Sequence, residues 1–265
     1  MDRILSTLAN EGPGALPGPP VLRRLFVSTL LSGLLLGGAP TSIAQDSAPV
    51  EGAASIVVDD FENESAGGAP DGWVFVKSSR KVLSYEEARE PGEKMVVRRE
   101  DGNRFVRLRT DGEALRFTKR NGVDFDWNLN AHPRLSWRWR ALELPEGASE
   151  RDKNDTGGAV YVTFGTDWLG RPKSIKYTYS SSLPVGTVVD FGNLYVIVVD
   201  SAREPGLGEW KTVERNVVQD YRQGFGDTPP DEPVSITLWS DSDTTGDEAT
   251  VDVDDIALRP SYRSE

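Results

Sequence analysis

The sequence predicts an all-β protein, a single antiparallel β-sandwich of jelly-roll type with one short helix. About a dozen short segments alternate apolar and polar residues, which is the period of strands that bury one face. Turn residues separate these segments, and no helices alternate with them, so a parallel βαβ architecture is not indicated. Residues 55–260 show no internal repeat and no boundary, and we therefore expect one domain there.

The alternating segments follow one another closely through this domain. We predict strands, in chain order, at residues 55–61, 73–77, 94–98, 104–109, 114–118, 134–142, 158–164, 174–179, 194–200, 210–217, 234–240 and 250–258. One stretch, residues 218–223, favours a helix. Dipeptides such as Asp101-Gly102 and Asp111-Gly112 supply the positive φ of tight turns, and Asp111-Gly112 predicts a hairpin between its flanking strands.

The N-terminal residues have the pattern of a secretory signal peptide. Arg23 and Arg24 precede an apolar run, residues 25–36, and small residues follow at Ser42 and Ala44. We assign residues 1–44 to the signal peptide, with a true start near residue 21, and residues 45–54 to a linker. The alternative is an N-terminal membrane anchor, although the run is shorter than the roughly 20 residues of a spanning helix. We expect export to the periplasm or beyond the cell.

Composition restricts the possible partners and reactions. Without residues 1–44 the chain has 27 basic and 40 acidic residues, a net charge of -13. This acidic protein should repel nucleic acid and anionic membranes, and we expect a monomer with no membrane contact after signal cleavage. Cysteine is absent and His132 is the one histidine, which removes the parts needed for serine–histidine catalysis and thiolate zinc sites. Any catalysis would depend on carboxylates, Tyr, Lys or Arg.

Strand periodicity predicts a polar face. In residues 135–140 the tryptophans Trp137 and Trp139 share one face, and Arg138 and Arg140 share the other. The same rule sets the remaining polar and aromatic residues opposite apolar ones, on one side of a sheet. Arginine forks and aromatic planes there suit a polar ligand, for instance an acidic saccharide. The predicted ligand-binding residues are Arg138, Arg140, Tyr161, Lys176, Trp239, Asp241 and Asp243. Alternatively, the arginines pair with acids such as Asp155 or Asp243, and the aromatics belong to the core.

The loop 241–246 partly fits a calcium loop. Asp241, Asp243 and Thr245 place oxygens at its first, third and fifth positions, with Gly246 at the sixth. Asp252 falls where the last acidic ligand would be. The alternative is a solvated turn that its own aspartates cap.

The two ends of the domain predict a second calcium site, of structural type. The predicted metal ligands are Asp59 and Glu62 on the first strand and Asp254 and Asp255 on the last. First and last strands are often neighbours in a jelly roll, and a calcium ion would relieve the repulsion between these acids. Alternatively, they form a ladder of charges that protects a sheet edge.

Several blocks resemble a bacterial family, the domain of unknown function 3047. Residues 133–140, with the sequence Pro-Arg-Leu-Ser-Trp-Arg-Trp-Arg, resemble its central strand, and residues 153–164 and 240–246 are similar to two further blocks. The similarity covers about residues 57–258. Two departures put ligand contacts at those positions in doubt: Ala159 stands where the family has Arg, and Thr244 where it has Asn. The resemblance implies the fold and export, but no reaction.

The domain ends also resemble carbohydrate-binding modules of the galactose-binding-like jelly-roll type. The matching pieces are residues 58–62, Gly72-Trp73 and residues 253–256. We therefore predict an exported bacterial protein that binds a polysaccharide or another polar ligand without catalysis. One alternative is a carboxylate-based glycoside hydrolase or polysaccharide lyase on the same scaffold. The other is a structural envelope domain that binds proteins.

Overall fold

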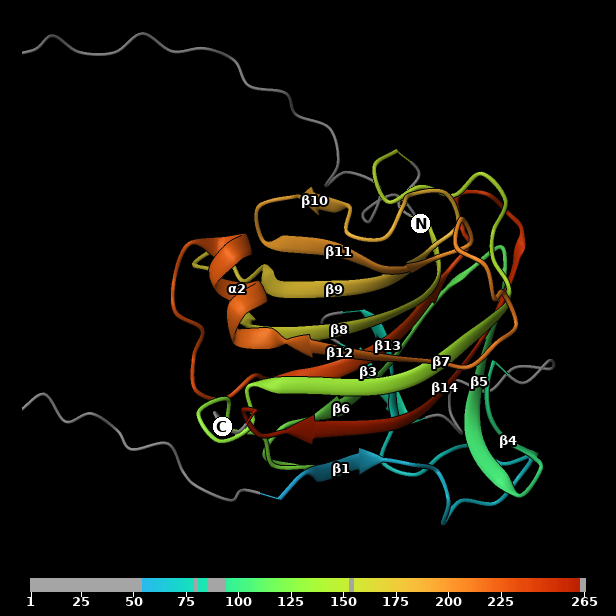
Figure 1. Cartoon of the computed structure of the whole chain (residues 1–265), viewed down its shortest axis with the longest axis horizontal. Coiled ribbons are helices and arrows are strands. Elements are labelled where there is room, and N and C mark those ends of the chain that lie inside the picture. Colours follow the sequence, from blue (N-terminus) through green and yellow to red (C-terminus); the bar gives the residue numbers. More distant parts are fainter. Residues whose placement is uncertain (1–53, 79–80, 85–93, 153–154, 263–265) are drawn as a thin grey trace, which may run out of the picture. The chain divides into compact units, whose positions relative to one another are not determined.

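The computed structural model describes residues 54–78, 81–84, 94–152 and 155–262, and these form two stacked β-sheets (Figure 1). The predicted signal peptide and all but the last residue of the predicted linker lie outside the described residues. No helix in the described part of the chain has the length and apolarity that a bilayer span requires.

The first sheet, sheet A, contains the first and the last strand of the domain. Its strand order is β12-β7-β14-β5-β4, with β1 paired to β14, and every pair is antiparallel. The pairing of β1 with β14 confirms that the first and last strands are neighbours. The bounds are β1 Ile56–Asp59, β4 Met95–Glu100, β5 Asn103–Asp111, β7 Arg134–Glu143, β12 Lys211–Asn216 and β14 Glu248–Arg259.

The second sheet, sheet B, has the order β10-β11-β9-β8-β13-β6-β2-β3. The bounds are β2 Val74–Ser78, β3 Lys81–Ser84, β6 Ala114–Arg120, β8 Thr156–Thr166, β9 Pro172–Ser180, β10 Val188–Asp190, β11 Leu194–Ser201 and β13 Ser235–Asp241. All twelve predicted strands form; β3 and β10 are additional. One pair, β11 with β9, is parallel, because the chain crosses over between these strands through β10.

A single described helix, α2 (Val217–Phe225), extends the predicted one by a few residues. The side chain of its N-cap Asn216 accepts a bond from the amide of Gln219, and Gly226 ends it at φ 68°. Tyr221 packs its ring against Phe164 of β8 at 4.6 Å, so the helix closes one end of the core.

The core lies between the inner faces of the two sheets. Trp137 and Trp139 of β7 are fully buried, as the alternation predicts. Across the interface, Trp137 lies 5.6 Å from Tyr177 and Trp139 lies 5.5 Å from Tyr179, measured between ring centroids. Because these aromatic pairs point into the core, the opposite face of each strand points outward. Strand periodicity places the polar residues on that outward face.

Two similar turn dipeptides have different roles. Asp101-Gly102 joins β4 and β5 as a two-residue hairpin, with φ of 52° and 92°, and Glu100 pairs with Asn103. The prediction of a hairpin at Asp111-Gly112 is wrong, because β5 belongs to sheet A and β6 to sheet B. This turn carries the chain from one layer to the other.

Candidate ligand-binding face

The predicted ligand-binding residues are divided between the two sheets. Arg138 and Arg140 lie on β7 of sheet A, whereas the aromatic and acidic members lie on sheet B or in the loop after β13. The prediction that they share one side of a sheet is therefore wrong. Alternation assigns the two faces of a strand, but it does not say which sheet the strand joins.

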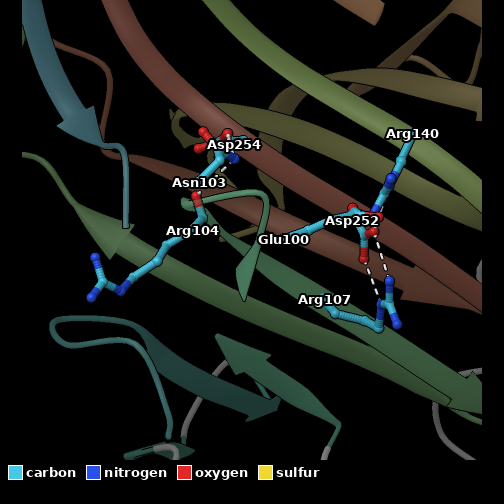
Figure 2. Close-up of polar contacts among 7 residues, drawn as sticks. All are labelled: Glu100, Asn103, Arg104, Arg107, Arg140, Asp252 and Asp254. Carbon is cyan, nitrogen blue, oxygen red and sulfur yellow. Dashed lines mark hydrogen bonds and ion pairs between the residues drawn. The ribbon is translucent and has the colours of Figure 1, made fainter. Parts of the chain in front are cut away.

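The outer face of sheet A is neutralised by cross-strand ion pairs. Asp252 of β14 is fully buried and accepts bonds from Arg107 Nε (2.6 Å) and Arg140 Nε (2.8 Å), which reach it from the two neighbouring strands (Figure 2). The hydrogen bond to Asp252 raises the pKa of Arg107. Asp252 therefore belongs to this pairing, not to the calcium loop in which the sequence placed it.

The other arginine of β7 is paired too. Arg138 Nη1 donates to Asp255 at 3.0 Å, and Arg140 also pairs with Glu100. Asp254 accepts from Asn103 Nδ2 at 3.0 Å (Figure 2), and burial raises the pKa of Asp254 to about 6. The alternative prediction that the arginines pair with acids is thus confirmed. The partners are Asp252, Asp255 and Glu100, and not Asp155 or Asp243.

A shallow pocket of about 310 Å³ opens on this face beside Arg138. Its second arginine, Arg259, donates to the hydroxyls of Ser136 and Ser55, both at 3.0 Å. Both guanidinium groups of the pocket therefore already have hydrogen-bond partners within the protein.

The four acids predicted to bind calcium at the domain ends do not form a cluster. Asp59 accepts from Trp73 Nε1 (2.7 Å) and pairs with Lys119 (2.8 Å). Glu62 accepts from the amide of Arg104 at 2.8 Å. Asp254 and Asp255 have the partners described above, so protein groups take the place of an ion at each acid.

The outer face of sheet B carries a row of four side chains, one on each of four neighbouring strands. Tyr161 (β8) stacks on Trp239 (β13), with centroids 4.9 Å apart and an interplanar angle of 22°. The guanidinium carbon of Arg116 (β6) lies 4.7 Å from the centroid of Trp239, and Lys176 Nζ (β9) lies 5.8 Å from that of Tyr161. We call Arg116, Trp239, Tyr161 and Lys176 the cation–aromatic row.

Both cations of this row lack direct partners. Within the described part of the chain, neither Arg116 nor Lys176 makes a hydrogen bond or an ion pair. Burial lowers the pKa of each, and nearby acids only partly offset it. Trp239 Nε1 is also buried without a bonding partner. Unbonded polar groups of this kind are costly to bury unless something else satisfies them.

Four acids lie beside the row. Glu150 accepts bonds from Thr178 (2.8 Å) and Ser180 (2.6 Å), whereas Asp155 accepts from the amide of Thr245 at 2.7 Å. In Asp155, Asp241 and Asp243, one carboxylate oxygen each lies within 4.8 Å of the others, and among the described residues this is the one group of three that suits a metal ion. Burial, followed by the charge of Asp243, raises the pKa of Asp241 to about 6. Calcium at this loop stays a prediction.

Sequence reasoning found five members of this site and missed three. Tyr161, Lys176, Trp239, Asp241 and Asp243 come together as predicted. Arg116 was missed although it alternates with Leu115 and Phe117 on a predicted strand, so periodicity could have found it. Asp155 and Glu150 were not proposed as ligand contacts, because both precede β8 in irregular chain, where no periodic signal exists.

Comparison with known proteins identifies a family. A model described as "Protein of unknown function (DUF3047)" matches residues 72–257, whereas no curated protein matches the sequence. Similar solved structures include carbohydrate-binding modules. The family 11 module of a Clostridium thermocellum cellulosomal cellulase has a TM-score of 0.40 and 12% identity, over 81% of this chain and 99% of that one. A family 30 module from the same organism gives 0.39 and 12%, over 80% and 100%. The xylan-binding CBM22-1 domain of Paenibacillus barcinonensis gives 0.37 and 11%, over 80% and 98%. At these identities the likeness concerns the fold alone.

Proposed function

The chain belongs to the DUF3047 family, and we propose that it binds a polysaccharide on the outer face of sheet B without catalysing a reaction. One observation carries the proposal. Trp239 is half-buried, stacks on Tyr161 and lies beneath Arg116; among the described residues, that arginine has no ion pair and the indole N–H of Trp239 has no hydrogen-bond partner.

The cation–aromatic row matches the chemistry of a sugar. A sugar ring has an apolar face of C–H groups, which packs on an aromatic plane, and a rim of hydroxyls that both donate and accept hydrogen bonds. Trp239 offers the exposed part of its ring, Arg116 offers donors, and the acids beside the row offer acceptors, whereas the fully buried Lys176 contributes only its charge. A ligand hydroxyl would therefore bond to Arg116, which is partly exposed and has no hydrogen bond or ion pair with the described residues.

The charges of the site favour a neutral glycan. The expected preference for an acidic saccharide depended on Arg138 and Arg140, which are paired with acids on the other sheet. Here the acids Glu150, Asp155, Asp241 and Asp243 outnumber the two cations of the row, and the whole chain has a net charge of -12. A carboxylated or sulfated polymer would meet net repulsion.

Export is part of the proposal. The signal-peptide pattern of residues 1–44 supports it, and a secreted or periplasmic protein would meet polysaccharides of the envelope or the surroundings.

Affinity electrophoresis of the mature chain tests the binding. Native gels would contain mixed-linked β-1,3-1,4-glucan, xylan, agarose, soluble starch or alginate, the last as the acidic comparison. We expect at least one neutral polymer to retard the wild type and Trp239→Ala to weaken that binding at least about tenfold, which corresponds to about 1.4 kcal/mol.

Trp210→Ala is the matched control, because Trp210 is also half-buried and contacts Arg138, Arg140 and Phe105 on the outer side of sheet A. This variant should bind like the wild type. Retardation by none of the polymers, or its loss in Trp210→Ala but not in Trp239→Ala, would contradict the proposal.

Glycoside hydrolysis is the second candidate, because Asp241 has a pKa near 6 beside Asp155 and Asp243. A carboxylic acid that is partly protonated near neutral pH can donate a proton to a leaving group. Release of reducing ends from the retarding polymer, abolished in Asp241→Asn, would establish hydrolysis in place of simple binding. Retardation without release of reducing ends would exclude it for that polymer.

A further inference from the structure

The turn between β8 and β9 presents an exposed tryptophan. Trp168 is 89% exposed, more than any other large hydrophobic side chain among the described residues, and the next residue, Leu169, is 55% exposed. Isolated apolar side chains on a surface are common, but an indole this exposed gains nothing from packing within the protein.

Hydrogen bonds to one side chain fix this turn. Asp167 Oδ1 accepts from the amides of Leu169 and Arg171, both at 2.9 Å, and its Oδ2 accepts from Arg171 Nε and Asn193 Nδ2, both at 2.7 Å. Burial acts to raise the pKa of Asp167, but the bonds from Arg171, Asn193 and Leu169 outweigh it and lower the pKa to about 2. The turn therefore keeps its conformation over the physiological pH range, and a ligand need not order it, which reduces the entropic cost of binding.

The turn is continuous with the proposed binding face. It caps the hairpin whose outer face carries Tyr161 and Lys176 (Figure 1). Trp168 follows Tyr161 by seven positions, a span of at most about 23 Å at the rise of a strand. Between them the outward positions hold Thr163 and Ser174, whose hydroxyls bond to each other at 3.0 Å. Beyond Thr163 the register shifts by one residue, and the exposed pair Thr166 and Pro172 leads into the turn.

We propose that Trp168 is a second stacking contact, and that the protein recognises an extended stretch of polysaccharide running along the β8–β9 hairpin. This inference depends on the proposed function. It adds that the ligand is a polymer of several sugars, contacted at Trp239 and at Trp168, and not a single sugar or a chain end.

The test compares ligand lengths by isothermal titration calorimetry. The probes are the polymer of the five-member panel that retards the wild type most, together with its own oligosaccharides of two to eight sugars. Trp168→Ala should weaken binding of the polymer and the longest oligosaccharides about tenfold and leave the shortest unchanged. Trp239→Ala should weaken binding at every length.

Two control variants accompany the test. Trp168→Phe keeps an aromatic plane and should retain most of the wild-type affinity for the polymer. Tyr262→Ala removes another exposed aromatic (75% exposed) and should leave the affinity unchanged.

Each other outcome identifies what has failed. Trp168→Ala binding like the wild type at every length would overturn the second contact and leave the proposed function standing. An equal loss at every length would place Trp168 in the primary site and overturn the two-point arrangement. Retardation by none of the five polymers would overturn the proposed function and this inference together.

Discussion

Each outer face of the sandwich has a half-buried tryptophan with an arginine over its ring, and the two arginines differ in what else they contact. Above Trp210, beside sheet A, Arg140 is bonded to Asp252 and Glu100. Above Trp239 on sheet B, Arg116 has no ion pair with the described residues. The same pair of side chains is therefore part of a closed network on one face and open to a ligand on the other.

The buried aspartates show the same contrast. Asp252 on sheet A has two arginine partners, whereas Asp241 on sheet B has two more acids around it, a long bond of 3.4 Å from the amide of Asp243, and a lysine that does not bond to it. A buried charge with good partners holds a structure together, and one without them needs an outside group. We conclude that the sheet A face is structural, and the proposal of a ligand concerns the sheet B face.

Removing Asp252 should have the largest effect on stability. In Asp252→Asn, Arg107 and Arg140 lose their shared carboxylate, and breaking a buried pair by removing one partner costs about 3 kcal/mol. Urea unfolding would measure this as a lower free energy of unfolding. A loss of less than about 1 kcal/mol would mean that the sheet A network is not structural.

Removing the charge of Asp241 should stabilise the folded protein, opposite to the effect expected at Asp252, and the gain should depend on pH. The folded protein raises the pKa of Asp241 to about 6, so the folded state binds a proton more tightly than the unfolded state between about pH 4 and 6. The contribution of Asp241 to the free energy of unfolding therefore falls as pH rises from about 4 to about 6. Asparagine cannot ionise, and Asp241→Asn should be more stable than wild type by about 1 kcal/mol at pH 8, with the gap closing at pH 4.

Thermal unfolding at the two pH values checks this, and a gain of about 1 kcal/mol corresponds to about 2–4 °C for a domain of this size. A destabilised Asp241→Asn at pH 8 would show that Asp241 is satisfied in the way that Asp252 is.

The lysine of the cation–aromatic row should act on Asp241 through charge alone. Lys176 lowers the pKa of Asp241 without a hydrogen bond, so Lys176→Met should raise that pKa by up to about one unit. Carboxyl carbon NMR during a pH titration measures the change. A pKa that stays constant would mean that the Lys176 ammonium points away from the acids.

The smallest effect is expected at an exposed pair on sheet A. Arg109 and Glu248 are 2.9 Å apart, but their side chains are 46% and 41% exposed. Water and salt screen such a pair, and Arg109→Ala should change the unfolding free energy by less than about 0.5 kcal/mol. A cost near that of Asp252→Asn would show that burial is not what distinguishes the strong pairs.

Local patterns predicted the strands and their faces, because alternation is a property of each strand alone. Trp137 and Trp139 are buried, and the residues between them point outward, as predicted. Alternation carries no information on partners distant in sequence. It therefore could not place Arg138 and Tyr161 on different sheets, or show that Asp111-Gly112 crosses between layers while Asp101-Gly102 makes a hairpin.

The candidate site could be predicted where its residues lie on strands. Tyr161 and Trp239 come together because β8 and β13 are paired, and both stood out as aromatics on polar faces. Asp155 reaches the loop 241–246 from the chain before β8, and a contact across 90 residues has no local signal. The metal-ligand prediction at the domain ends had the pairing of β1 and β14 right. It missed Lys119, which neutralises Asp59 from β6 of the other sheet.

Indole N–H resonances report most directly on which face binds. The chain has seven tryptophans, and a ¹⁵N-labelled sample gives one indole signal for each. On addition of the polysaccharide that retards the protein in gels, the Trp239 signal should shift and the Trp210 signal should stay in place. A shift at Trp210 with none at Trp239 would contradict the assignment of binding to sheet B.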